Sequence, residues 1–169
     1  MKFDPSLVYT ESSSPLGPIW MAATDTGLAG MWFVGQRHAP DPTGWTHVSV
    51  PNSQQHPVLN AANQQLQAYF AGHLRQFELP LDLRGGTVFQ QSVWQALLCI
   101  PVGETTSYGE ISRRIAKPLA VRAVGTAIGR NPISIIVPCH RVVGMDGSLT
   151  GYAGGLDRKL ALLQLEDAL

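Results

Sequence analysis

A cysteine and a histidine stand side by side at Cys139 and His140, directly after Pro138. The thiolate is the nucleophilic form of cysteine, and a neighbouring imidazole is a base that can generate it. The chain contains only one other cysteine, Cys99, so this placement is not a matter of composition. The pair predicts a reactive thiol. The alternative is a cysteine buried as a small apolar side chain, which is the commoner role of a lone cysteine.

The residues before this pair indicate how the thiol is presented. A β-branched apolar run at residues 133–137 is typical of a short buried strand. We expect the strand to end at Pro138, because proline has no N–H to donate to a strand ladder. Cys139 then follows at the junction of strand and loop, where scaffolds commonly present functional residues.

The last segment of the chain adds a carboxylate. Three leucines have the spacing of one helical face, at Leu156, Leu160 and Leu163. One further step of three residues on that face reaches Glu166. Buried carboxylates are rare unless they are paired, so we expect Glu166 to orient an imidazole, directly or through water. The alternative is a frayed helix end with Glu166 in solvent.

Residues 1–84 predict a small N-terminal α/β domain, made of a sheet and a helix. Two short apolar segments, at residues 19–23 and 28–33, are separated by a Thr-Asp-Thr-Gly turn and indicate two strands. We place the domain boundary before Gly85-Gly86, so that the second domain spans residues 85–169.

Three further segments complete the first domain. Residues 37–57 are rich in Pro, His, Thr, Ser and Gln and indicate a long surface loop. Apolar residues at helical spacing from Leu59 to Phe70 predict a helix. Residues 77–83 alternate between apolar and polar types, which indicates an extended segment, and Pro80 favours a sheet edge or a linker.

Residues 85–169 predict a mainly helical domain. Apolar residues from Phe89 to Leu98 share one helical face, and the helix is expected to end before Pro101. Cys99 follows this stripe, and we expect it to be buried or half-buried and without chemistry.

A helix-turn-helix is expected in the middle of this domain. Ser107, followed three residues later by Glu110, matches a capping box and predicts a helix that begins at Tyr108. A second helix is expected from about Ala120 to Arg130. Two short helices joined by a tight turn are typical of the helix-turn-helix motif.

The second of these helices has an unusual surface. If Val121, Val124 and Ile128 face the core, small residues and two arginines remain outside. These outward residues are Arg122, Ala123, Thr126, Ala127, Gly129 and Arg130. Such a surface suits a helix pressed into a narrow groove lined by phosphates. The alternative is close packing against another helix of this chain.

Composition and charge narrow the class of protein. The chain has 169 residues, 44% of them hydrophobic and 14% charged, which is typical of a globular protein. Its formal net charge is zero, but residues 101–141 carry six basic and two acidic side chains. That excess suits a polyanion, although a solvated helical face has the same appearance.

These residues together resemble the O6-alkylguanine-DNA alkyltransferases, also called methylated-DNA-protein-cysteine methyltransferases. The resemblance covers most of residues 87–166, and its most specific part is the Pro-Cys-His-Arg-Val run at 138–142. Residues 1–84 match only loosely. The other matching positions are Ile100-Pro101, Ser107-Tyr108-Gly109, Arg122-Ala123-Val124-Gly125, Asn131-Pro132, Gly151-Tyr152, Gly154-Gly155 and Glu166.

The resemblance implies a repair reaction in which each protein molecule acts once. Cys139, as a thiolate, attacks the alkyl carbon on O6 of guanine, and also on O4 of thymine. His140, polarised by Glu166 through a bridging water, takes the thiol proton. Asn131 braces the turn around the thiol. No step releases the alkyl group, so the transfer is irreversible and stoichiometric.

The resemblance also implies how DNA is held. The helix-turn-helix enters the minor groove, Arg122 fills the gap left by the extruded nucleotide, and Tyr108 favours flipping and bonds the base. Ala123, Thr126 and Ala127 belong to the same DNA-facing helix. Base flipping is a physical requirement, because a nucleophile on the protein cannot reach guanine O6 inside the base stack.

The flipped base is expected to meet a small set of groups. The carbonyls of Cys139 and Val142 accept from the guanine amino group, Tyr152 contributes to the base site, and the backbone N–H of Ala153 faces O6. Some relatives carry serine at position 153. Ala153 keeps the backbone donor, so we expect activity to persist, with a changed tolerance for bulky adducts.

The partner that we expect is double-stranded DNA containing alkylated guanine or thymine. Neutral net charge predicts a modest, salt-sensitive affinity. We expect a monomer in the cytoplasm. We expect no membrane association, because no apolar run approaches the roughly 20 residues that span a bilayer. Cooperative association along DNA stays open. We expect no metal and no other cofactor, since no Cys-x-x-Cys or His-x-x-x-His spacing is present.

Three competing functions remain at this stage. An alkyltransferase-like lesion sensor keeps the DNA-binding scaffold but lacks the acceptor thiol, and Cys139 argues against it. A cysteine hydrolase uses Cys, His and a carboxylate for acyl transfer, but it needs an oxyanion hole and leaves the DNA-binding helix unexplained. A plain helix-turn-helix regulator makes the Cys-His-Glu set a coincidence.

Overall fold

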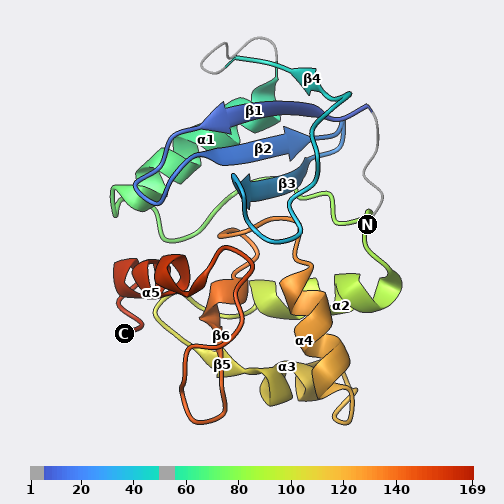
Figure 1. Ribbon diagram of the computed structural model, residues 1–169, viewed down its shortest axis with the longest axis vertical. Helices are drawn as coiled ribbons and strands as arrows, with labels where there is room; N and C mark the ends of the chain where they lie inside the picture. The colour runs from blue at the N-terminus through green and yellow to red at the C-terminus, as the bar shows by residue number, and fades with distance from the viewer. Residues whose placement is uncertain (1–5, 50–55) are drawn as a thin grey trace. The chain divides into compact units, whose positions relative to one another are not determined.

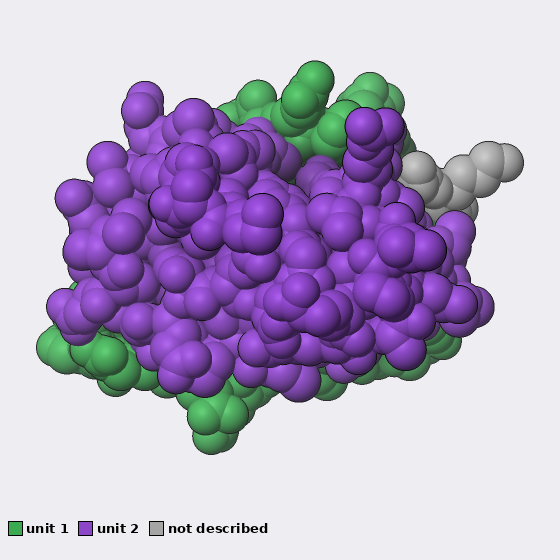
Figure 2. All heavy atoms as spheres, turned by 90° about the horizontal axis from the view of Figure 1, so that it is seen from below, with its two compact units in different colours: residues 1–85 green, residues 86–169 purple. Residues whose placement is uncertain are grey.

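The computed structural model describes residues 6–49 and 56–169 of the chain (Figure 1). The chain divides into two compact units, residues 1–85 and residues 86–169, which Figure 2 colours separately. The division falls after Gly85, whereas the sequence placed it after Arg84. The first unit combines a sheet with a helix and the second is mainly helical, which confirms the expected fold class.

The first unit is built on a mixed four-stranded sheet. Its strands run in the order β3-β2-β1-β4, with β1, β2 and β3 antiparallel and β4 parallel to β1. The strands are β1 (Val8–Ser12), β2 (Ile19–Ala23), β3 (Leu28–Phe33) and β4 (Thr46–His47). The sequence predicted β2 and β3 and missed β1 and β4. The short strand β4 lies inside the stretch expected to be a loop, of which residues 50–55 fall outside the described residues.

Helix α1 (Pro57–Phe70) covers one face of this sheet (Figure 1). Proline suits the first turn of a helix because the N–H that it lacks would have no partner there. Leu59, Ala62 and Leu66 are buried against the sheet at the spacing of one helical face. On the opposite face, Trp32 centres a second apolar cluster. The first unit therefore has apolar packing on both sides of its sheet.

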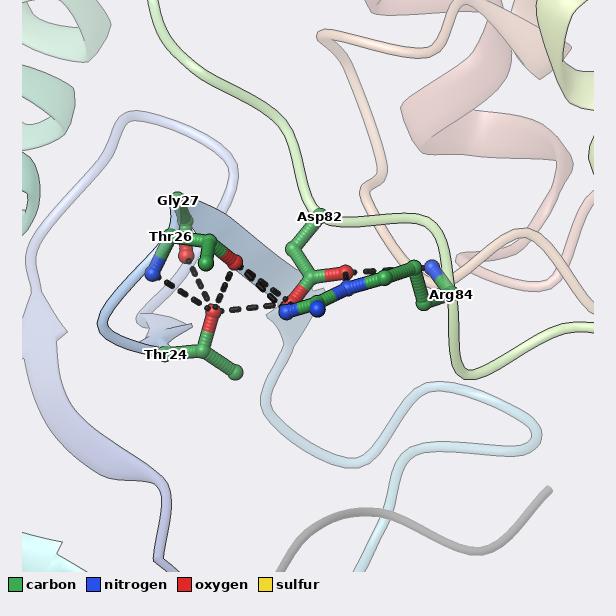
Figure 3. Close-up of polar contacts among 5 residues, drawn as sticks. All are labelled: Thr24, Thr26, Gly27, Asp82 and Arg84. Atoms are coloured by element: carbon green, nitrogen blue, oxygen red, sulfur yellow. Dashed lines mark hydrogen bonds and ion pairs between the residues drawn. The ribbon is translucent and has the colours of Figure 1, made fainter.

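The turn between β2 and β3 is held by the end of the same unit (Figure 3). The Asp82 carboxylate accepts hydrogen bonds from the hydroxyls of Thr24 and Thr26, at 2.8 and 3.0 Å, and from the Arg84 guanidinium at 2.7 Å. Gly27 lies so close to this segment that an added Cβ would come within 2.5 Å of the Pro80 carbonyl oxygen. The turn thus requires glycine at that position.

The segment before Asp82 pairs with the edge of the sheet. Leu81 forms a parallel bridge with Leu28, and the Leu28 N–H donates to the Pro80 carbonyl at 2.8 Å. The extended edge expected for residues 77–83 is therefore limited to this single bridge. Proline is tolerated there because its carbonyl, and not its missing N–H, makes the contact.

The second unit contains four helices and a small parallel ribbon among its described residues. Helix α2 packs against α3 and α4, which pack against each other as a helix-turn-helix (Figure 1). Strand β5 pairs with β6 directly after the thiol segment. The elements are α2 (Val88–Leu98), β5 (Thr106–Ser107), α3 (Tyr108–Arg114), α4 (Val121–Gly129), the 3₁₀ turn η1 (Cys139–Arg141), β6 (Val142–Val143) and α5 (Leu156–Leu165).

Two local expectations in this unit need correction. The Ser107 hydroxyl accepts from the Glu110 N–H at 3.2 Å, so α3 is capped as expected, but the Glu110 carboxylate does not reach back. It pairs with Arg113 and Arg114 instead, at 2.6 and 3.4 Å. Cys99 is exposed rather than buried, because it lies at the C-cap of α2, beyond Leu97, the last buried residue of that helix.

Candidate active site around Cys139

The thiol of Cys139 lies at the start of η1 and is buried, with 4% of the residue exposed. The strand expected at residues 133–137 is wrong: residues 134–136 form a turn, between a single bridge residue at 133 and a bend at 137. Within it, Ile135 has a positive φ of 72°, which a β-branched residue rarely adopts. Such backbone strain persists only where surrounding contacts impose it, and it is common at functional sites.

Asn131 imposes much of this turn. Its side-chain amide donates to the Val137 carbonyl at 2.7 Å and to the Cys139 sulfur at 3.1 Å. Its side-chain oxygen accepts from the Ile133 N–H at 3.0 Å. One buried asparagine thus replaces the hydrogen bonds that a strand ladder would give, and it points a donor at the sulfur.

His140 and Glu166 meet directly. The His140 Nε2 and the Glu166 Oε1 are 3.0 Å apart, and both side chains are almost fully buried. Only the imidazole N–H can donate to the carboxylate, so Nε2 carries the proton and Nδ1 is the unprotonated nitrogen. Nδ1 has no hydrogen-bond partner among the described residues. Burial lowers the pKa of His140, with smaller contributions from Arg141 and Lys159.

Arg141 holds the same carboxylate. Its Nε donates to one oxygen of Glu166 at 2.8 Å and its Nη2 to the other at 2.9 Å, while Nη1 donates to the Ile100 carbonyl. Burial acts to raise the pKa of Glu166, but the hydrogen bonds from Arg141 and His140 together outweigh it and lower the pKa to about 2. Glu166 is therefore ionised and fixed in orientation.

The helix that carries Glu166 has a different register from the one expected. Glu166 is buried, but Leu156 and Leu160 are 47% and 38% exposed. The buried face of α5 is formed by Lys159, Leu162 and Leu163. Glu166 follows Leu163 and Leu162 by three and four residues, so it shares this face. The buried face was misplaced because only apolar residues were expected on it, whereas Lys159 is part of it.

Opposing influences act on the pKa of the Cys139 thiol. Burial raises its pKa, since a thiolate is poorly solvated in the interior. The amide of Asn131, the charge of Lys159 and the backbone N–H groups of Cys139 and His140 act in the opposite direction. The site therefore surrounds the sulfur with groups that favour a thiolate, while burial favours the thiol.

Helix α4 presents most of the predicted surface. Arg122, Ala123 and Thr126 are exposed. Ala127 is buried, with 3% exposed, and its carbonyl accepts from the Trp94 indole N–H at 2.9 Å. The expectation that Ala127 faces outward is therefore wrong. Val121, expected in the core, is 39% exposed, which moves the buried face of α4 by about one residue.

The basic side chains of residues 101–141 differ in availability. Arg141 is buried on Glu166, so counting it among bases open to a polyanion was wrong. Arg113 and Arg114 share Glu110. Arg122 and Arg130 are exposed and form no ion pair within the described ranges. The positive charge left for a ligand thus lies on Arg122 and Arg130, at α4 and its C-cap, and on Lys117, which is likewise exposed and in no ion pair within the described ranges.

The residues expected to meet a base lie along one stretch of this unit. The Tyr108 hydroxyl, at the start of α3, donates to the Thr150 carbonyl at 3.2 Å. The Tyr152 ring lies edge-on to His140, with ring centroids 6.5 Å apart. Val142 is buried in β6 and Ala153 is half-buried. Tyr108 thus contacts, at Thr150, the same loop that carries Tyr152 two residues later.

Comparisons with known proteins decide the family. Residues 88–168 match the model of the 6-O-methylguanine DNA methyltransferase DNA-binding domain, and residues 7–83 match that of its ribonuclease-like domain. A methylated-DNA–protein-cysteine methyltransferase of Mycobacterium tuberculosis H37Rv is 52% identical over 158 residues, which cover 94% of this chain and 91% of that protein. The chain belongs to the 6-O-methylguanine DNA methyltransferase family.

Further members of the family agree along the whole chain. A methylated-DNA–protein-cysteine methyltransferase of Methanosarcina acetivorans is 49% identical over 161 residues, which cover 95% of this chain and 98% of that protein. The crystal structure of M. tuberculosis OGT in complex with DNA superimposes with a TM-score of 0.85 at 50% identity. It covers 95% of this chain and 93% of that one. Both units are therefore those of the family.

The sequence did not predict that two cationic side chains, Arg141 and Lys159, are buried. Arg141 was read as a base for phosphate contact, and Lys159 was not singled out. A signal existed for Lys159, because it stands among leucines on α5 at the spacing of the buried face. Within residues 6–49 and 56–169, no helix is long and apolar enough to cross a bilayer. The same residues contain no group of three or more Asp, Glu, His or Cys side chains that could hold a metal ion.

Proposed function

We propose that this chain repairs duplex DNA by transferring an alkyl group from O6 of guanine to the sulfur of Cys139, once and irreversibly. Membership of the family makes the chain a DNA-repair methyltransferase of the methylated-DNA–protein-cysteine kind. The choice of acceptor rests on His140, which directly follows Cys139 in the sequence. Glu166 holds the Nε2 of this imidazole, and its Nδ1 has no hydrogen-bond partner in the part of the chain that the structure describes.

The transfer balances with the groups present. His140 takes the proton of the Cys139 thiol at Nδ1, directly or through water, and Glu166 stabilises the resulting imidazolium. The thiolate forms a bond to the alkyl carbon, and the bond from that carbon to O6 breaks with its electron pair moving to guanine. Guanine then takes up one proton, which restores the normal base. The products are a thioether and guanine.

Asn131 serves two purposes in this scheme. Its amide donates to the sulfur, which favours the thiolate over the thiol. Its other hydrogen bonds fix the turn that leads to Cys139. In-line displacement demands that the sulfur, the carbon and O6 be aligned, so a rigid turn contributes through positioning.

Helix α4 is the surface that we propose for DNA. Small exposed side chains at Ala123 and Thr126 permit close approach to a groove, and Arg122 supplies positive charge. We assign this helix to the minor groove, with Arg122 filling the space of a flipped nucleotide and Tyr108 bonding the base. Flipping is needed because the buried sulfur cannot enter the base stack.

The base site that we propose continues from the thiol. The carbonyls of Cys139 and Val142 accept from the guanine amino group, Tyr152 lines the site, and the Ala153 N–H donates to O6. O4-alkylthymine is the second substrate, since its alkyl carbon also lies on an exocyclic oxygen. Burial and the nearby Cys139 raise the pKa of the Tyr152 phenol well above its usual value, so it acts as a neutral group.

One experiment tests acceptor and stoichiometry together. Duplex DNA with a labelled methyl on guanine O6 is mixed with excess protein, and the digested protein is analysed by mass spectrometry. We expect one label per molecule, on the peptide that contains Cys139. Cys139→Ser is expected to bind the duplex and accept no label, while Cys99→Ser, which alters the exposed thiol, is expected to behave as the parent.

Three results would contradict this function. The first is label on Cys99, the second is the repair of several lesions per protein molecule, and the third is label that stays on the DNA at protein excess. Each of them contradicts Cys139 as the single acceptor. The same assay with O4-methylthymine duplex tests the second substrate. A fluorescent base analogue in the lesion position, which brightens when it leaves the stack, tests flipping in Cys139→Ser.

A further inference from the structure

The turn of the helix-turn-helix carries a leucine on its surface. Leu119, between α3 and α4, is 100% exposed, and Val121, the first residue of α4, is 39% exposed. Figure 1 shows this turn at an edge of the second unit. A fully exposed leucine side chain buries no apolar surface, so it adds nothing to the stability of the fold. The fold therefore does not explain why an apolar residue stands at this position.

Hydrogen bonds hold this turn in one shape. The Lys117 carbonyl accepts from the Ala120 N–H at 2.9 Å and from the hydroxyl of Ser112, which is fully buried. The Lys117 N–H donates to the Ser112 carbonyl at 2.9 Å. Pro118 occupies the second position of the turn, where proline is favoured, and Leu119 occupies the third, where turn chemistry does not call for leucine. The turn thus presents Leu119 on a rigid support.

The charge around the turn is positive. From residue 111 to residue 145 the sequence contains six Lys or Arg and no Asp or Glu. Lys117 and Arg122 flank Leu119 in the sequence, and both are exposed and in no ion pair within the described ranges. The apolar tip therefore stands between two exposed cations. A partner that covers the tip is expected to carry negative charge on both sides of an apolar surface.

The minor groove of DNA has this chemistry. Phosphates line its two edges, and the C–H groups of the deoxyribose rings form its walls. Proteins that bind this groove often insert single apolar side chains into it. A stable protein partner, by contrast, needs roughly 800 Å² of surface on each side. Leu119 and Val121 are too few to supply such a patch, so duplex DNA is the occupant that fits.

We propose that Leu119 is a contact residue for duplex DNA, whose side chain packs against the sugar walls of the minor groove close to the point at which Arg122 enters. This inference rests on the proposed function, in which α4 lies in that groove. Lys117 contacts a phosphate at the edge of the groove. The leucine contact releases no counterions, so it adds affinity that depends little on salt.

Three substitutions separate the apolar contact from the charge beside it. Leu119→Gln removes the apolar contact at similar size, Leu119→Met keeps it, and Lys117→Gln removes a neighbouring charge. Val88→Gln is the matched control, because Val88 is 86% exposed at the start of α2, outside the helix-turn-helix. All four side chains are changed at exposed positions, so we expect unchanged melting temperatures.

The decisive readout is affinity for an unmodified duplex, measured by fluorescence anisotropy at several salt concentrations in Cys139→Ser protein. We expect Leu119→Gln to weaken binding about tenfold at every salt concentration. Leu119→Met and Val88→Gln are expected to bind like the parent. Lys117→Gln is expected to lower the slope of log affinity against log salt by about one. A single strand has no minor groove, so we expect Leu119→Gln to bind it like the parent.

Two results would overturn the proposal. The first is parent-like affinity of Leu119→Gln for the duplex, and the second is an equal loss of affinity for duplex and single strand. With Cys139 intact, Leu119→Gln is expected to need about tenfold more protein for half-maximal transfer from lesion duplex, at an unchanged maximal rate. A parent that binds duplex but accepts no alkyl group contradicts the proposed function, while the binding measurements still test Leu119.

Discussion

Arg141 donates to both carboxylate oxygens of Glu166, at 2.8 and 2.9 Å, in a buried bidentate ion pair. This geometry leaves Glu166 ionised with one oxygen also facing His140 at 3.0 Å. The arginine therefore decides, through the carboxylate, which imidazole nitrogen carries the proton. It does so without touching the sulfur.

Loss of the Arg141–Glu166 ion pair is expected to destabilise the protein strongly. Arg141→Met leaves the Glu166 carboxylate buried without its cation, which typically costs about 3–5 kcal/mol. Chemical denaturation measures the loss. Arg113→Met is the matched control, since it breaks an exposed pair with Glu110, and we expect it to change stability little. Equal losses in the two variants would contradict the role given to Arg141.

Acid is expected to weaken the protein through Glu166. Its pKa is about 2 in the folded chain and 4.5 for an unperturbed glutamate, so its stabilisation is complete above pH 4.5 and is lost as pH falls toward 2. Denaturation of the parent and of Glu166→Gln across this range measures the effect. The stability difference between them is expected to shrink as pH falls, and a constant difference would show that ionisation of Glu166 contributes nothing.

Asn131→Ala is expected to affect both stability and repair. It leaves the Ile133 N–H without its partner, which costs about 1–3 kcal/mol for a buried group, while the Val137 carbonyl keeps only the Cys139 N–H as donor. It also removes the donor to the Cys139 sulfur. Transfer is also expected to slow in Asn131→Asp, which keeps the acceptor for Ile133 but places a carboxylate against the Cys139 sulfur and the Val137 carbonyl. The comparison uses single-turnover rates at a temperature where both variants are folded.

A pair of leucine substitutions on α4 tests which of its faces meets DNA. Ala127→Leu inserts bulk into a buried position and is expected to lower stability by about 1–3 kcal/mol. Ala123→Leu places the same bulk on the exposed face. It is expected to leave the melting temperature unchanged and weaken DNA binding, measured by fluorescence anisotropy. Weaker binding by a fully folded Ala127→Leu alone would reverse this assignment.

Arg122→Ala is expected to slow repair of a folded protein. The side chain is exposed and forms no ion pair among the described residues, so stability is expected to change by less than about 0.5 kcal/mol. Transfer from duplex DNA is expected to fall more than transfer from a single strand, because a single strand needs no gap filled. A large drop in melting temperature would make Arg122 structural.

The sequence located the candidate site better than it described the backbone that supports it. Cys139, His140 and Glu166 came from residue types, spacing and the family resemblance, and the structure brings the last two within 3.0 Å. The strand before Cys139 was wrong because periodicity reads side chains alone. The Asn131 amide satisfies those backbone groups locally, which no apolar pattern can reveal.

The register of two helices also escaped the pattern. On α5 the buried face includes Lys159, because two carbonyls satisfy its ammonium, while Leu156 and Leu160 are partly exposed. On α4 the Trp94 indole, from another helix, reaches the Ala127 carbonyl and buries that alanine. Both outcomes depend on tertiary partners from distant parts of the chain.

The carboxylate that completes the centre lies 26 residues after the imidazole that it orients. In the unfolded chain the sulfur therefore has a neighbouring imidazole but no carboxylate that fixes the tautomer of that imidazole. Proton removal from the thiol is thus coupled to folding, because only the packing of α5 on the 3₁₀ turn brings Glu166 to His140.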